Sequence, residues 1–103
     1  MSIYRRAAKV DANQVDIVEA LRTAGASVEA IRRPVDLLIG HSGRTMLMEV
    51  KNPASERGKR EAKAGGNKNQ LDFKATWRGG TVVTVDSVEA ALRALAVLTF
   101  LRS

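Results

Sequence analysis

Three charged side chains near the middle of the chain have the types and the spacing for metal-assisted chemistry on a phosphate. Asp36 stands inside the apolar run 35–40, and Glu49 and Lys51 stand two positions apart at the end of the run 44–51. Two carboxylates, a backbone carbonyl and waters supply the oxygen ligands that Mg²⁺ prefers. A neighbouring lysine would orient or deprotonate the attacking water, or neutralise charge that develops on the phosphate. These residue types point to phosphodiester hydrolysis.

The elements that must position these side chains form a predicted β-hairpin over residues 35–51. The turn residues 41–43 (His-Ser-Gly) separate the two runs. Because side chains alternate between the faces of a strand, Glu49 and Lys51 share one face. Asp36 interrupts an apolar strand that is expected to be buried on both faces, so its charge requires compensation. His41 is expected to be a solvent-exposed turn residue rather than a ligand or base.

Asp36 followed thirteen positions later by Glu49-Val50-Lys51 resembles the Asp…Glu-x-Lys signature of the PD-(D/E)XK nuclease superfamily. Within it, the chain most resembles virus-type replication-repair nuclease (VRR-NUC) domains and archaeal-type Holliday junction resolvases. The resemblance implies Mg²⁺ or Mn²⁺ held by Asp36, Glu49 and the Val50 carbonyl, with Lys51 acting on water. It also implies a DNA endonuclease, selective for junction or flap structures, that leaves a 5′ phosphate. Only the hairpin motif is specific, since the rest of the chain matches in the order of elements.

Two glutamines are candidates for supporting contacts at this site. Gln14 fits a capping box opened by Asp11. It also stands, counted back from Gly25, where resolvase-like relatives carry a glutamate, so both interpretations stay open; a neutral amide there would weaken metal binding. Gln70, followed by Phe73, resembles a glutamine of VRR-NUC domains that would orient a metal-bound water or a phosphate oxygen. The alternative for Gln70 is an ordinary polar residue in the first turn of a helix.

The charge of the chain predicts a polyanionic partner, most simply DNA, either branched or duplex. The net charge is +6 and the isoelectric point is near 10.3. The basic residues flank the proposed site, in an N-terminal arm (1–10), before the hairpin, and in a basic loop (52–68). Exposed charge without function remains the alternative for each of them. The candidate DNA contacts are Arg5, Arg6, Lys9, Arg32, Arg33, Arg57, Lys59, Arg60, Lys63 and Lys68.

Length and composition predict one intracellular nuclease domain over residues 1–103. The chain has no cysteine, which excludes disulfides and thiolate metal sites, and it has no apolar run long enough to span a membrane. No small-molecule cofactor is expected. The resemblance implies a cytoplasmic protein of a bacterial or phage-infected host cell. The apolar tail 97–101 exceeds what a terminal helix buries alone, so a homodimer is expected.

The order of predicted elements is αβββαβα, an α/β domain with a central mixed sheet and a restriction-endonuclease-like core. We expect helices over 11–24, 69–78 and after Asp86, strands over 26–31 and 81–85, and the hairpin between them. A capping box over 86–89 opens the last helix. Trp77 is expected to fill the core rather than to stack on a nucleobase. The segment 52–69 is expected to be a loop or a partly ordered helix.

A different class of function is also compatible with the sequence, namely a non-catalytic nucleic-acid-binding module. Glu49 and Lys51 would then form a structural ion pair, which contributes little on a surface. Asp36 would act as a cap or pair with Arg32 or Arg33. Geometry discriminates between the two hypotheses, because the enzyme needs both carboxylates on one face around a metal-sized gap.

Overall fold

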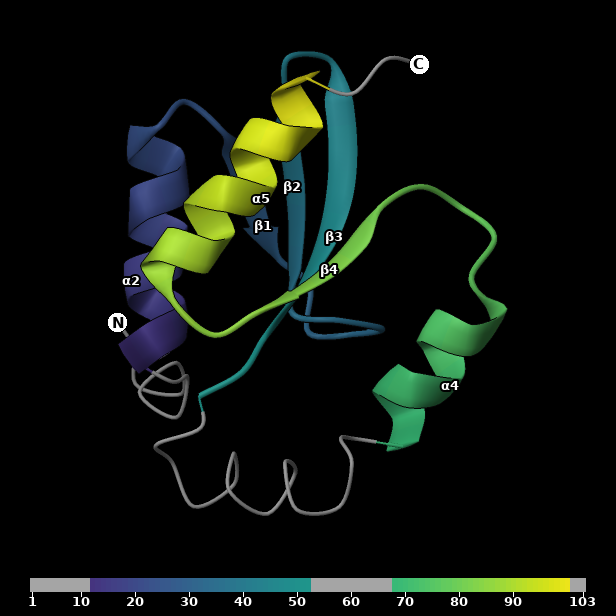
Figure 1. Cartoon of the computed structure of the whole chain (residues 1–103). Helices are drawn as coiled ribbons and strands as arrows, with labels where there is room; N and C mark the ends of the chain where they lie inside the picture. Colours follow the sequence, from purple (N-terminus) through teal and green to yellow (C-terminus); the bar gives the residue numbers. More distant parts are fainter. Residues whose placement is uncertain (1–11, 53–67, 101–103) are drawn as a thin grey trace.

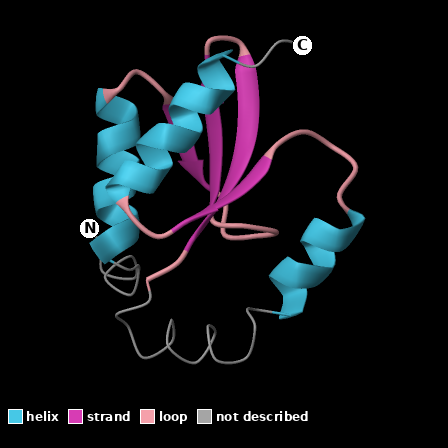
Figure 2. Cartoon of the chain, viewed as in Figure 1, coloured by secondary structure: helices cyan, strands magenta, loops and turns pink. Residues whose placement is uncertain are grey.

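The structure is a computed structural model, and it describes residues 12–52 and 68–100. Figure 1 shows the described elements, and Figure 2 distinguishes helices from strands. Their order along the chain is αβββαβα, as predicted, and they form one α/β domain with a mixed sheet. The elements are α2 (Ala12–Thr23), β1 (Ser27–Ala30), β2 (Leu37–His41), β3 (Arg44–Val50), α4 (Lys68–Thr76), β4 (Val82–Val85) and α5 (Val88–Phe100).

The four strands form one sheet in the order β1-β2-β3-β4. The pairs β1 with β2 and β2 with β3 are antiparallel, whereas β4 runs parallel to β3. The parallel pair requires a crossover between β3 and β4, and α4 belongs to that connection. Helices α2 and α5 cover one face of the sheet, and α4 lies on the other side (Figure 1). Strand β3 therefore lies between two neighbours, with helices on both sides of the sheet.

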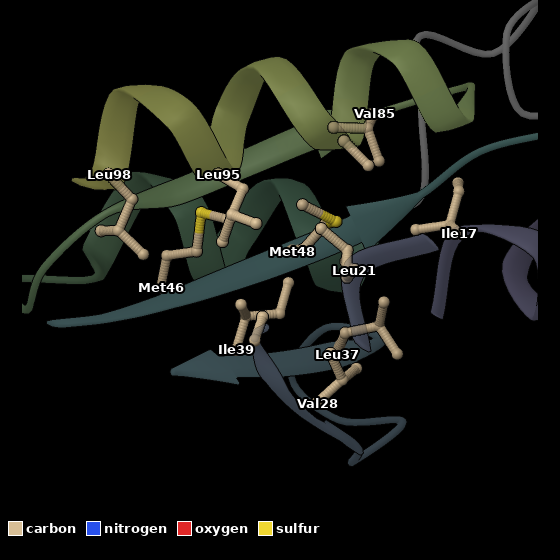
Figure 3. Packing of buried hydrophobic residues seen from close by; sticks show 12 residues of the cluster. Ile17, Leu21, Val28, Leu37, Ile39, Met46, Met48, Val85, Leu95 and Leu98 are labelled. Atoms are coloured by element: carbon tan, nitrogen blue, oxygen red, sulfur yellow. The ribbon is translucent and has the colours of Figure 1, made fainter. Parts of the chain in front are cut away.

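The hydrophobic core lies between the sheet and the pair α2 and α5. Alternate residues of β2 and β3, beginning with Leu37 and Met46, point into it, which is the period of two expected for strands. Figure 3 shows Leu95 and Leu98 of α5 packed above Met46. The buried cluster consists of Ile17, Leu21, Ala26, Val28, Leu37, Ile39, Met46, Met48, Val85, Ala91, Leu95 and Leu98. The opposite face of the sheet carries the polar residues described in the next subsection.

The hairpin turn is shorter than predicted, because Ser42 and Gly43 alone form it. Both have positive φ, 54° and 74°, which is the pattern of a two-residue type I′ turn. His41 was predicted to be an exposed turn residue, and this is wrong. It pairs with Arg44 as the last residue of β2 and is half-buried. Its Nδ1 lies 3.0 Å from Ser42 Oγ and 3.2 Å from the hydroxyl of Thr99 on α5.

The two ends of the last helix differ from the predictions. The N-cap is Ser87, whose Oγ accepts a hydrogen bond of 3.1 Å from the amide of Ala90. The predicted capping box over 86–89 is therefore wrong, because Ala90 has no side chain that could reach back to the N-cap. Leu98 is buried, whereas Phe100 is 83% exposed, because only one stripe of the helix reaches the sheet. Leu101 lies outside the described residues. None of the described helices has the length and apolarity needed to cross a membrane.

The turn geometry predicts a stability difference between two glycines of the hairpin. Gly43→Ala places a side chain at positive φ and should lower the free energy of unfolding by roughly 1–2 kcal/mol. Gly40→Ala is the matched control, since a Cβ there meets its nearest neighbours at 3.8 and 3.9 Å without a positive φ. Urea unfolding of both variants measures the difference, and equal losses would contradict the turn assignment.

Candidate active site

A buried glutamate lies on the polar face of the sheet. Glu49 is only 2% exposed, and it is the one charged side chain that is buried in the part of the chain that the structure describes. It points away from the core because it alternates with Met48 and Val50 along β3. In the parallel register it lies beside Thr84 of β4. A carboxylate in this position requires charge partners from its own face of the sheet.

Two lysines supply those partners. Lys51 Nζ lies 2.7 Å from Glu49 Oε2, and Lys74 Nζ of α4 lies 2.8 Å from Oε1. The contact of Lys74 is an ion pair outside hydrogen-bond geometry, so Oε1 is buried without a directed hydrogen bond from any described residue. Lys74 instead donates a hydrogen bond of 2.7 Å to Thr84 Oγ1. The Glu49–Lys51 pair was predicted from the sequence, but Lys74 was not.

These contacts decide the protonation state of Glu49. Burial by itself raises the pKa of a carboxyl group, but the nearby ammonium groups of Lys51 and Lys74 outweigh burial and hold the pKa of Glu49 below its ordinary value of 4.5. The side chain is therefore an anion at neutral pH. An ionised, dehydrated carboxylate of this kind is suited to hold a cation or to fix the position of an ammonium group.

Asp36 lies just before β2, near the end of β3 that carries Glu49. It precedes β2, and continuing the register of β2 with β3 by one residue places it opposite Glu49. Its Oδ2 accepts a hydrogen bond of 2.7 Å from the amide of Val50. In a continued antiparallel pair of β2 and β3, that amide would bind the carbonyl of residue 35 instead. The strand that follows is not buried on both faces as expected, because Leu38 is 36% exposed. The negative charge of Asp36 is therefore compensated in part by the backbone N–H group of Val50.

The donor set on this face is compatible with the predicted Mg²⁺ or Mn²⁺. N–H and C=O groups of one strand residue point to the same side, so the Val50 carbonyl is directed toward β2, where Asp36 lies. The buried Oε1 of Glu49 contacts the Lys74 ammonium at 2.8 Å, so a cation at this atom would share it with Lys74. Among residues 12–52 and 68–100, no three His, Cys, Asp or Glu side chains gather as a metal site. Mg²⁺ needs only one or two carboxylates, with waters and phosphate completing its shell.

Gln70 of α4 lies beside Lys51. Its Oε1 accepts a hydrogen bond of 3.0 Å from Lys51 Nζ. The same ammonium therefore bridges Glu49 and Gln70 and connects β3 with α4. The contact orients Lys51, whereas the predicted contact of Gln70 with water or phosphate remains a prediction.

On α2, the side chain that reaches the site region is Asn13 rather than Gln14. Asn13 Nδ2 donates to the Lys51 carbonyl at 2.8 Å and to the Asp86 carbonyl at 3.0 Å. The Lys51 amide in turn donates to the carbonyl of Val85 at 2.8 Å, so the backbone of Lys51 is held on both sides. Gln14 is half-buried and makes no side-chain hydrogen bond with a described residue. Its role at the site remains a prediction, and its capping partner Asp11 lies outside the described residues.

The predicted DNA contacts are only partly described. Arg32 and Arg33 are exposed in the loop between β1 and β2, and Arg32 has a positive φ of 68°. Neither forms an ion pair with the carboxylate of Asp36, although the amide of Arg32 lies 3.4 Å from the Asp36 carbonyl. The side chains of Arg5, Arg6, Lys9, Arg57, Lys59, Arg60, Lys63 and Lys68 lie outside what the structure describes.

Comparison of the chain with protein-family models, with characterised proteins and with solved structures finds no match.

The double contact of Asn13 predicts a structural role for its amide. Asn13→Asp replaces both donated protons by an oxygen that faces two carbonyls, and should lower the free energy of unfolding by about 1–3 kcal/mol. Gln14→Glu is the matched control, because it makes the same chemical change one residue later without losing a described hydrogen bond. Urea unfolding of both variants tests this, and equal losses would exclude the contact.

The lowered pKa of Glu49 predicts a pH-dependent contribution to stability. In EDTA at neutral pH, Glu49→Gln should lower the free energy of unfolding by about 1–3 kcal/mol. A depressed folded-state pKa means that this difference is largest above 4.5 and shrinks as the pH falls through and below that value. Urea unfolding from neutral pH to about pH 3 measures it, beside Glu29→Gln at an exposed position of β1. A difference independent of pH would show that the charge of Glu49 contributes nothing.

Proposed function

We propose that the chain is a Mg²⁺- or Mn²⁺-dependent DNA endonuclease of the PD-(D/E)XK superfamily. The observation that carries the proposal is the buried Glu49, paired with Lys51 at 2.7 Å, at the end of the hairpin where Asp36 accepts a hydrogen bond from Val50. The αβββαβα order of elements is compatible with the restriction-endonuclease-like core of that superfamily.

Each site residue has a distinct part in the proposed reaction. Asp36, Glu49 and the Val50 carbonyl hold the cation, which when bound supplies positive charge at the phosphate and a lowered pKa of water. Lys51 places its ammonium near the phosphate and stabilises the negative charge that develops there. Gln70 fixes that ammonium through the 3.0 Å hydrogen bond. The oxygen of a water molecule forms a new bond to phosphorus while the bond from phosphorus to the 3′ oxygen breaks, and the leaving 3′ oxygen takes up a proton. The resemblance to resolvases favours this 5′ phosphate product.

The proposed substrate is DNA, and junction or flap structures are favoured by the resemblance. The net charge of +6 supports binding to a phosphate backbone through counterion release. Arg32 and Arg33 are exposed on the loop that leads to Asp36, so we assign them to contacts with the phosphate backbone. The proposed setting is the cytoplasm of a bacterial or phage-infected cell.

A homodimer is part of the proposal, because cutting two strands requires two sites. The exposed apolar residues of α5, Leu92, Val97 and Phe100, offer a surface for a second copy. An interface related by a two-fold axis would use this surface on both subunits.

A second candidate, a non-catalytic nucleic-acid-binding module, is favoured by one observation. Lys74 gives Glu49 a second ammonium partner, so the buried carboxylate is already compensated without a metal. Under this hypothesis Glu49, Lys51 and Lys74 only fix α4 to the sheet. The two candidates differ in cleavage and agree in binding.

Cleavage of labelled four-way junction, flap, duplex and single-stranded DNA separates the candidates. We expect cutting with Mg²⁺ or Mn²⁺ and none in EDTA. Asp36→Asn and Lys51→Met should each lower the rate by about 100-fold or more, since each removes a charge next to the reacting phosphate. Arg93→Ala is the control, because it removes an exposed cation from α5 on the other side of the sheet.

Two results would contradict the proposal. Metal-dependent cutting that survives in both site variants would place the active site elsewhere. Binding of these DNAs without cutting under either metal would leave the binding module as the function.

A further inference from the structure

An exposed tryptophan ends the helix that covers the candidate site. Trp77 follows α4 and is 45% exposed, so the prediction that it fills the core is wrong. The reason is the position of α4, none of whose described side chains is buried. Trp77 is the chain's only tryptophan, and Leu71 on the same helix is also exposed. A large aromatic surface therefore faces solvent.

Three contacts fix the orientation of this indole. Its Nε1 donates a hydrogen bond of 3.1 Å to the Gly80 carbonyl, and its ring centroid lies 5.1 Å from that of Phe73. It also lies against Gly79, where an added Cβ would come within 2.2 Å of the ring. The indole N–H is thus satisfied within the chain, so a ligand would contact the exposed part of the ring.

Basic residues flank Trp77 in the sequence, and the helix that precedes it contacts the candidate site. Lys74 lies three residues earlier, in the last turn of α4. The ammonium of Lys74 contacts Glu49 Oε1. Arg78 follows immediately and is exposed. A planar ring flanked by cations matches a nucleotide, in which a π face is joined to a phosphate.

We propose that Trp77 is a stacking platform for one unpaired base of a nucleic-acid strand, next to the bond that is cut. The proposal rests on the nuclease function and specifies its substrate class. A base inside a continuous duplex has both faces covered by neighbouring bases, so only an unpaired base reaches the indole. Substrates with a single-stranded segment beside the cut, such as a flap, should bind better than a continuous duplex.

The fluorescence of Trp77 tests the stacking directly, because no other tryptophan contributes to the signal. In EDTA, where no cleavage is expected, a short oligothymidylate should quench it. An abasic oligonucleotide of equal length carries the same phosphates without bases, and it should not quench, nor should a continuous duplex. Equal quenching by the abasic strand, or none by oligothymidylate, would overturn the proposal.

Variants supply an independent measure through the anisotropy of a labelled oligothymidylate. Trp77→Leu should raise Kd between about fivefold and 100-fold, and Trp77→Phe, which keeps a smaller ring, should raise it less. Neither should change Kd for the abasic strand, which serves as the matched control. Gly79→Ala keeps the tryptophan but displaces the ring, so it should weaken oligothymidylate binding too. Circular dichroism checks that each variant is folded.

The remaining outcomes are also decisive. An equal rise in Kd for both strands would assign Trp77 to folding or to a protein partner and overturn the proposal. Because binding is measured without metal, its failure is separable from failure of the nuclease proposal. Stacking without metal-dependent cutting would leave a binding module with a base platform. Cutting without stacking would leave a nuclease whose Trp77 has another role.

Discussion

The burial of one carboxylate is the constraint on which the polar face of this protein depends. A charged group removed from water costs several kcal/mol unless other charges and hydrogen bonds compensate it, and Glu49 is 2% exposed. Lys51 and Lys74 provide that compensation from two different elements. The compensation therefore connects the middle of the sheet to α4. Because no described side chain of α4 is buried, these polar contacts hold the helix in place of a hydrophobic interface.

Charge balance at the site follows from the same contacts. Asp36 and Glu49 carry two negative charges, and Lys51 and Lys74 carry two positive ones, so the four groups are neutral together. A phosphodiester brought to this face adds negative charge, and more develops as it reacts. Under the nuclease proposal, a divalent cation restores the balance, and it competes with Lys74 for the lone pairs of Glu49 Oε1. The position of α4 and the occupancy of the site would then be linked through one oxygen atom.

Local features of this structure were predictable from the sequence, and distant contacts were not. The hairpin was predictable because apolar alternation and the Ser42-Gly43 turn act over neighbouring residues. The shared face of Glu49 and Lys51 follows from strand alternation alone. Asn13 was missed because its partner Lys51 lies 38 residues away, and an asparagine near a helix start gives no signal of such a contact. The exposure of Trp77 was missed because composition cannot tell which helix lies outside the core.

Asp36 shows how much a charged residue inside an apolar run can reveal about function. Its cost within an apolar run was recognised, and the carboxylate is indeed compensated, in part by the amide of Val50. That hydrogen bond occurs where β2 has not yet begun, so the side chain replaces a carbonyl of the ladder and the strands separate there. The Val50 carbonyl points to the same side as its amide, toward Asp36. The hydrogen bond from Val50 fits either hypothesis, so the nuclease proposal depends on whether Asp36 also binds a cation.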